Sequence, residues 1–223
     1  MRRFQAVIFD MDGLVLDSEY GYFAAWRLAA TEMGLQLSET FCSGLSGAHG
    51  AEIRQRLLTH FGMDFQLERF YQLSKDIWLQ EVQQQGIPVK TGFHGLLQLI
   101  KELNLPYCLA TNSRRVDVEQ CLLWAGLEGV FDTIICREDV VRPKPAADIF
   151  IKSTEMLSLS PQHCMVLEDS PIGVIAATAA GCYCLFVPSV LPADREACKL
   201  ADGVFADLSA VADFISAGLD HPL

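Results

Sequence analysis

The sequence lacks any hydrophobic run long enough to cross a membrane. Apolar residues make up 51% of the chain, yet no unbroken apolar stretch approaches the roughly 18 to 20 residues that a membrane span needs. The start also lacks the features of a secretory signal, because the apolar segment behind Arg2 and Arg3 is short and is interrupted by Asp10 and Asp12. We therefore expect no membrane partner and a cytoplasmic location.

An excess of positive charge is also missing. The 17 lysines and arginines face 28 acidic residues, which gives a formal net charge of -11 at pH 7. Nucleic-acid binding requires clustered Lys and Arg, so this balance argues against a nucleic-acid partner. It also repels small anions at long range, so an anionic ligand would need positive charge supplied inside its site. The oligomeric state is left open, with a slight preference for a monomer.

Cysteine is present, but not in a pattern typical of disulfides or zinc. Cys182 and Cys184, among the eight cysteines, are one residue apart, which is neither a CxxC redox pair nor a zinc-binding spacing. Because no export signal is expected, we interpret the cysteines as reduced thiols.

Short apolar runs recur along the chain, and most are separated by segments long enough for a helix. This pattern predicts an α/β fold with a doubly wound parallel sheet and crossover helices. The expected strands are 6–9, 107–110, 133–136, 164–167 and 182–187.

The stretch from residue 16 to 88 breaks this rhythm. It predicts helices at roughly 19–33, 51–61 and 67–85, joined by a loop of mostly small residues from Ser43 to Gly50. Since no convincing strand lies between them, we expect a small all-helical cap domain, 16–88, inserted after the first strand. Residues 1–15 plus 89–223 would then form the α/β core domain.

Unusually polar residues follow the predicted strands. The carboxyl ends of parallel strands meet at one edge of a sheet, where such folds bind ligands. Each residue alone also fits a role in a turn or a helix cap. Together they would crowd like charges, which is costly unless a cation or proton offsets them. The residues are Asp10 and Asp12, Thr111, Asn112 and Ser113, Lys144 between two prolines, and Glu168 and Asp169.

Phosphoryl transfer would explain this crowding. A carboxylate such as Asp10 can attack phosphorus and hold it as an acyl phosphate, which divides one difficult displacement into two easier ones. The charge on the transferring group requires a hard divalent ion, and Mg2+ prefers carboxylate oxygens. Asp10 and Asp169 suit it as ligands, with Glu168 binding directly or from just outside.

The other polar residues have roles in the same reaction. Lys144 can neutralise the nucleophile and the phosphate oxygens, and Thr111 can donate a hydrogen bond to the phosphoryl group. If the chain bends at Gly13, Asp12 can lie over the leaving group, protonate it, and later deprotonate the attacking water.

These residues resemble the four ordered motifs of the haloacid dehalogenase superfamily, in its phosphatase and β-phosphoglucomutase branch. The resemblance implies a Rossmann-like core with a cap and a phosphoric monoester hydrolase that acts on a small phosphorylated metabolite through an aspartyl-phosphate. It also implies that the Asp12 backbone carbonyl binds Mg2+ and that Thr111 and Lys144 bind phosphate, with Asn112 and Ser113 as secondary contacts. The motifs are 9–13, 111–112, Lys144 with Pro145, and 168–170.

Two alternatives stay open. The mutase branch carries basic residues in its cap, where this chain has Tyr22, Ser46 and Gly50, and the loop 43–50 has no Lys or Arg. Hydrolysis is therefore favoured over a phosphosugar mutase activity. The mutase stays an alternative, because Arg54 lies close to this loop in sequence. A phospho-receiver signalling module has similar residues, but it places its acidic pair on the first strand.

Substrate selection is assigned to cap residues and to one core residue. Tyr22 and Trp26 are four apart on a predicted helix, so a packing role is at least as expected as substrate contact. The candidates are Glu19, Tyr22, Trp26, Ser46, Gly47, His49 and Ser113.

Overall fold

The computed structural model describes residues 4–45 and 50–220. The chain divides into two compact units, Met1–Asp17 with Pro88–Leu223, and Ser18–Ile87. We call the first the core unit and the second the helical unit. The sequence predicted domain borders after residues 15 and 88. That these borders separate two domains stays a prediction. Among the described residues, no helix is long and apolar enough to cross a membrane.

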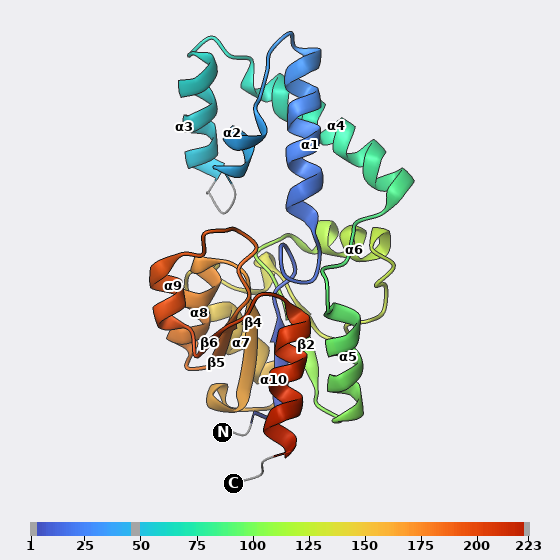
Figure 1. The fold of residues 1–223 in the computed structure, drawn as a ribbon, viewed down its shortest axis with the longest axis vertical. Helices are drawn as coiled ribbons and strands as arrows, with labels where there is room; N and C mark the ends of the chain where they lie inside the picture. Colours follow the sequence, from blue (N-terminus) through green and yellow to red (C-terminus); the bar gives the residue numbers. More distant parts are fainter. Residues whose placement is uncertain (1–3, 46–49, 221–223) are drawn as a thin grey trace. The chain divides into compact units, whose positions relative to one another are not determined.

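The core unit is built on a six-stranded parallel sheet with the strand order β3-β2-β1-β4-β5-β6. Together with its helices, it confirms the predicted doubly wound α/β fold (Figure 1). The sequence did not predict β6, whose two residues are too short for a recognisable apolar run. The strands are β1 Ala6–Phe9, β2 Tyr107–Ala110, β3 Ile134–Ile135, β4 Cys164–Glu168, β5 Tyr183–Phe186 and β6 Gly203–Val204.

The strand order places the end of β1 at the point where the order in which strands are added to the sheet reverses. The chain leaves β1 toward β2 and β3 on one side, then returns to β4 on the other side, so Phe9 pairs with both Leu109 and Leu167. Ligands of doubly wound folds bind at this switch point, outside the carboxyl ends of the strands. Asp10 is the residue that follows β1 there.

Helices cover both faces of this sheet. Because side chains alternate along a strand, Ala6 and Ile8 join the apolar cluster that includes α7, α8 and α9. Phe9 contacts the rings of Phe93 and Phe131, at centroid distances of 5.8 and 5.9 Å. Helices α5 and α10 lie side by side (Figure 1). The helices are α5 Phe93–Glu102, α6 Arg115–Trp124, α7 Asp148–Met156, α8 Pro171–Ala180, α9 Arg195–Leu200 and α10 Leu208–Asp220, with short 3-10 turns at Arg137–Asp139 and Pro161–His163.

The helical unit packs around its own apolar cluster. Phe70 is fully buried there, and Trp26 packs against it at a ring-centroid distance of 5.9 Å. The short helix α2, which was not predicted, begins after Ser38, whose hydroxyl accepts a hydrogen bond from Phe41 N. The helices are α1 Ser18–Glu32, α2 Glu39–Ser43, α3 Gly50–Phe61 and α4 Leu67–Gln85.

Replacing Phe70 with alanine tests the packing of the helical unit. We expect Phe70→Ala to lower the free energy of unfolding by about 3 to 5 kcal/mol, because it removes a large buried ring and leaves a cavity. Urea unfolding followed by tryptophan fluorescence measures this. Leu28→Ala, at a half-exposed position on α1, is the control and should change stability by less than about 0.5 kcal/mol. Equal losses in the two variants would contradict the packing described.

Candidate active site

Asp10 lies at the carboxyl end of β1, in the middle of the sheet. Its backbone amide donates to Leu167 O at 3.0 Å, which continues the hydrogen-bond ladder between β1 and β4 beyond the strand. The side chain is buried. The Asp10 carboxylate is therefore held where water is scarce and where charges interact more strongly than in bulk water.

The chain turns tightly after β1. Leu16 N donates to Met11 O at 2.9 Å, and Gly13 N donates to Leu16 O at 2.8 Å. Gly13 has a φ of +85°, and a Cβ at this position would lie 2.1 Å from Asp169 Oδ2. Only glycine fits here, because any side chain would collide with the Asp169 carboxylate. The bend predicted at Gly13 is confirmed.

A single buried ammonium group joins three elements of the core unit. Lys144 Nζ donates to Asp10 Oδ1 at 2.5 Å, to Glu168 Oε1 at 2.6 Å and to Ala110 O at 2.9 Å. An ammonium has three N–H donors, so these contacts use its full capacity. The Phe150 ring lies 5.0 Å from Nζ. One cation thus bridges two buried carboxylates.

Burial and neighbouring charges perturb both partners of this ion pair. Burial raises the pKa of the Asp10 carboxyl to about 8, while Lys144 opposes the rise and the Glu168 charge adds to it. Burial alone would lower the pKa of Lys144, but the Asp10 and Glu168 charges outweigh it and raise that pKa. All three partners of Lys144 Nζ are oxygen acceptors, which requires the ammonium form. A divalent cation beside Asp10 would oppose the rise in the Asp10 pKa and favour the ionised carboxylate.

Asn112 holds the backbone of Lys144 from the neighbouring loop. Its Oδ1 accepts from Lys144 N at 3.0 Å, and its Nδ2 donates to Lys144 O at 3.2 Å. Both ends of the amide side chain are therefore used on one residue. The sequence predicted Asn112 as a phosphate contact. No sequence signal pointed to this pairing, because the two residues are far apart in the chain.

Glu168 is buried at the end of β4 and faces protein donors. While Oε1 accepts from Lys144, Oε2 accepts from Asp169 N at 3.0 Å, Ser170 N at 3.1 Å and Ser170 Oγ at 3.0 Å. The Ser170 hydroxyl also caps α8, because Oγ accepts a hydrogen bond from Gly173 N. A Cβ at Gly173 would lie 1.8 Å from the Glu168 carboxylate, so the helix leaves room for Glu168 there.

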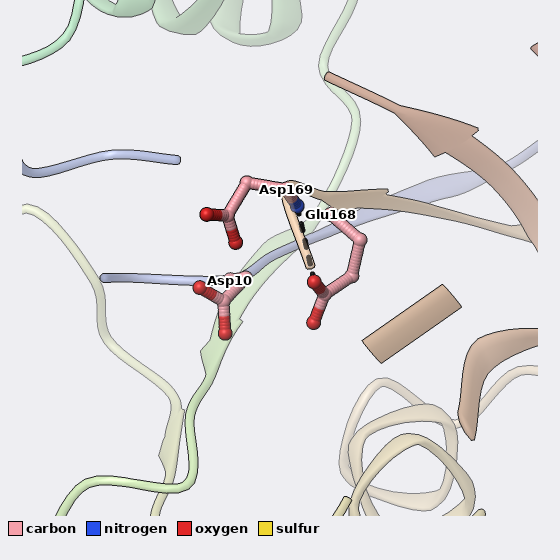
Figure 2. A group of neighbouring side chains, drawn as sticks. All are labelled: Asp10, Glu168 and Asp169. Atoms are coloured by element: carbon pink, nitrogen blue, oxygen red, sulfur yellow. Dashed lines mark hydrogen bonds between the residues drawn. The ribbon is translucent and has the colours of Figure 1, made fainter. Parts of the chain in front are cut away.

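Three carboxylates gather near the end of β1. Asp10, Glu168 and Asp169 each offer an oxygen, and these oxygens all lie within 4.8 Å of one another. Figure 2 shows the Glu168 carboxylate folded back toward the Asp169 amide, to which it is hydrogen-bonded. Carboxylate oxygens are the donors that Mg2+ prefers, and it usually keeps several waters as well. The donor set therefore fits a magnesium ion.

Asp12 lies beside this cluster, and two hydroxyl groups from the loop after β2 contact it. Ser113 Oγ donates to Asp12 Oδ2 at 2.7 Å, and Thr111 Oγ1 lies 3.5 Å from the same oxygen. A serine just before a helix often caps it, but Ser113 does not. The capping position of α6 is Arg114, which leaves the Ser113 hydroxyl for the aspartate.

Comparison with known proteins agrees with this geometry. The model of the haloacid dehalogenase-like hydrolase family matches residues 7–187, a range that includes every residue of the candidate site described above. The chain belongs to the haloacid dehalogenase-like hydrolases.

Relatives within this haloacid dehalogenase-like family include phosphatases. Fructose-1-phosphate phosphatase YqaB of Escherichia coli (strain K12) is 28% identical over 80% of this chain and 94% of its own length. Protein SUPPRESSOR OF QUENCHING 1, chloroplastic, of Arabidopsis thaliana is 32% identical over 83% of this chain, which spans only 18% of that plant protein. A crystal structure from Thermotoga maritima, provisionally assigned as a β-phosphoglucomutase, is 25% identical with a TM-score of 0.82 and covers 96% of this chain and 99% of its own. These relatives support a phosphatase or a mutase.

The residues predicted to select the substrate differ from one another in their surroundings. Tyr22 stacks on Trp78 with a centroid distance of 4.6 Å and an interplanar angle of 10°, whereas Trp26 packs in the helical unit's cluster. The sequence analysis missed Trp78, whose partner lies on another helix. Ser46, Gly47, His49 and the side chain of Glu19 lie outside the described residues.

Glu168→Gln tests whether the Glu168 carboxylate is an essential acceptor. An amide nitrogen in place of either oxygen would face Lys144 or the donors at residues 169 and 170, so we expect a loss of about 3 kcal/mol or more in unfolding free energy. Chemical denaturation measures this loss. The control is Glu196→Gln, which alters an exposed ion pair with Lys199 and should change stability by less than about 0.5 kcal/mol. If both variants unfold at the same denaturant concentration, the described network is wrong.

Proposed function

We propose that this chain is a Mg2+-dependent phosphatase that hydrolyses small phosphomonoesters through an aspartyl-phosphate on Asp10. The observation that carries the proposal is the environment of the buried Asp10 carboxylate. Lys144 Nζ lies 2.5 Å from one of its oxygens, and a second carboxylate, Asp169, lies within metal-binding reach. A nucleophilic carboxylate needs both features: a cation to orient it and a second cation site to draw the phosphate toward it.

In the first step, an Asp10 oxygen attacks phosphorus while the bond from phosphorus to the ester oxygen breaks. The leaving alkoxide takes a proton from the Asp12 carboxyl, so the alcohol departs neutral. The Thr111 hydroxyl, just after β2, is proposed to bind a phosphate oxygen. Lys144, whose three donors are already used, is proposed to attract the phosphate as a buried positive charge beside Asp10.

In the second step, water attacks the phosphorus of the aspartyl-phosphate. Asp12, now ionised, accepts a proton from this water, and the bond between phosphorus and the Asp10 oxygen breaks. Inorganic phosphate leaves, and both aspartates return to their starting protonation states. One residue serves as acid and then as base, which is the reason for a carboxylate two positions after the nucleophile.

The Asp10 and Asp169 carboxylates, with the Asp12 backbone carbonyl, are proposed to hold Mg2+. When bound, the ion supplies positive charge that offsets the negative charge of the transferring phosphoryl group. We assign Glu168 to positioning Lys144 rather than to direct metal binding. The support is its hydrogen bonding, because both oxygens already accept from protein donors.

Hydrolysis is favoured over mutase activity by the charges in the helical unit. A mutase holds a bisphosphate, whose second phosphate needs cations of its own. In the described part of this unit, three arginines, including Arg54, are already paired with glutamates. A second phosphate would have to compete with these partners. The ion pairs are Arg27–Glu39, Arg54–Glu68 and Arg56–Glu52, with N–O distances of 3.9, 3.1 and 2.6 Å.

The proposed substrate is a sugar phosphate or a similar small metabolite. The E. coli relative's activity on fructose 1-phosphate supports this class. We also propose the cytoplasm as the compartment, because all eight cysteines are free thiols, and burial raises the pKa of thiols such as Cys108 to about 12. Such thiols are mostly protonated and unreactive.

Asp10→Asn tests the nucleophile. We expect turnover of 4-nitrophenyl phosphate to fall on the order of 10⁴-fold or more, since an amide cannot form the covalent intermediate, as seen when other nucleophiles are removed. A colorimetric assay measures this. The control is Asp132→Asn, an exposed position in the core unit, which should keep full activity. Unchanged turnover in Asp10→Asn would exclude the proposed mechanism.

Asp169→Asn tests the metal site. Chelation of divalent ions should abolish the activity of the unmodified chain, and Mg2+ should restore it. In Asp169→Asn, we expect the Mg2+ concentration for half-maximal activity to rise at least about tenfold, since even residues outside the ligand set have effects of this size. Glu155→Gln removes an exposed acid from the same unit and should leave this concentration unchanged. An identical Mg2+ dependence in Asp169→Asn and the unmodified chain would argue against the assigned ligand.

A further inference from the structure

The backbone alone does not fix the direction of the Asp12 carboxylate. The turn after β1 fixes its backbone, because Gly13 N donates to Leu16 O at 2.8 Å and Asp12 forms a parallel bridge with Leu16. The side chain still has two rotatable bonds and is only partly buried. Turn geometry alone therefore leaves several rotamers open to the carboxylate.

Ser113 supplies a partner for this carboxylate. Its hydroxyl donates to Asp12 Oδ2 at 2.7 Å, a length typical of a strong O–H to carboxylate hydrogen bond. The Thr111 hydroxyl, at 3.5 Å from the same oxygen, is too distant to hold it as firmly. Ser113 is thus the main contact from this loop to Asp12.

The backbone of Ser113 is itself fixed on both sides. Its amide donates to Thr111 Oγ1 at 3.0 Å, and its carbonyl accepts from Arg137 N at 3.0 Å. The loop after β2 is thereby tied to the short turn after β3. A hydroxyl on such a support can define where a flexible neighbour lies.

We infer that Ser113 is a positioning residue, which holds the Asp12 carboxylate in the orientation from which it transfers protons, rather than a residue that contacts the substrate. The inference rests on the proposed function, in which Asp12 is the acid and base. A positioned acid matters most when the leaving group is a poor one, because a good leaving group departs without protonation.

A series of substituted phenyl phosphates separates positioning from substrate contact. These esters share one shape and differ in the basicity of the leaving phenolate. In Ser113→Ala, we expect kcat/KM for phenyl phosphate to fall about tenfold, and kcat/KM for 4-nitrophenyl phosphate to fall less than about threefold. The dependence of rate on leaving-group basicity should become steeper. Ser113→Thr, which restores a hydroxyl, should recover the original dependence.

Two controls complete the experiment. Ser216→Ala removes a hydroxyl that donates to Ala212 O at 2.9 Å within α10, and should leave the dependence unchanged. Asp12→Ala should show the same selective loss as Ser113→Ala, but a larger one. Thermal unfolding of each variant establishes that it is folded.

The outcomes separate this inference from the proposed function. If the unmodified chain hydrolyses both esters and Asp10→Asn neither, the proposed function stands. An equal loss on both esters in Ser113→Ala, or no loss on either, would then overturn the positioning role alone. Failure of the unmodified chain to hydrolyse any of the esters would overturn both.

Discussion

The arrangement of the candidate site in the core unit depends on one buried ammonium ion, that of Lys144. It lies between Asp10 and Glu168 with hydrogen bonds to both. Removing such charges from water costs several kcal/mol each, and this cost is offset only if every donor and acceptor is well placed. The Asn112 side chain on the lysine backbone and the three donors on Glu168 are the parts that keep them in place.

The same charges explain why the site suits a divalent cation. When ionised, the carboxylates of Asp10, Glu168 and Asp169 outnumber the Lys144 ammonium by two, since three negative charges face one positive charge. That excess equals the charge of one magnesium ion. Stability and the proposed function therefore depend on one arrangement, in which like charges are crowded and a bound cation would relieve the crowding.

Much of the fold could be predicted from the sequence, because buried parallel strands leave continuous apolar runs and their ends leave polar residues. The short elements β6 and α2 could not, since two to five residues carry too little periodicity. The topology was enough to predict which core residues gather at one edge of the sheet. The contacts of Asn112 with Lys144 and of Ser113 with Asp12 could not be predicted. They join loops that are far apart in the sequence, and they depend on the directions of the side chains.

The two connections to the helical unit run next to each other in the core unit. Asp17 N donates to Pro88 O at 2.8 Å, Lys90 N donates to Val15 O at 2.9 Å, and Leu16 pairs with Val89 in antiparallel fashion. The seventy residues Ser18–Ile87 are thus inserted between two chain segments that are hydrogen-bonded to each other. In evolutionary terms, such a segment can be lengthened, shortened or exchanged while β1 keeps its register.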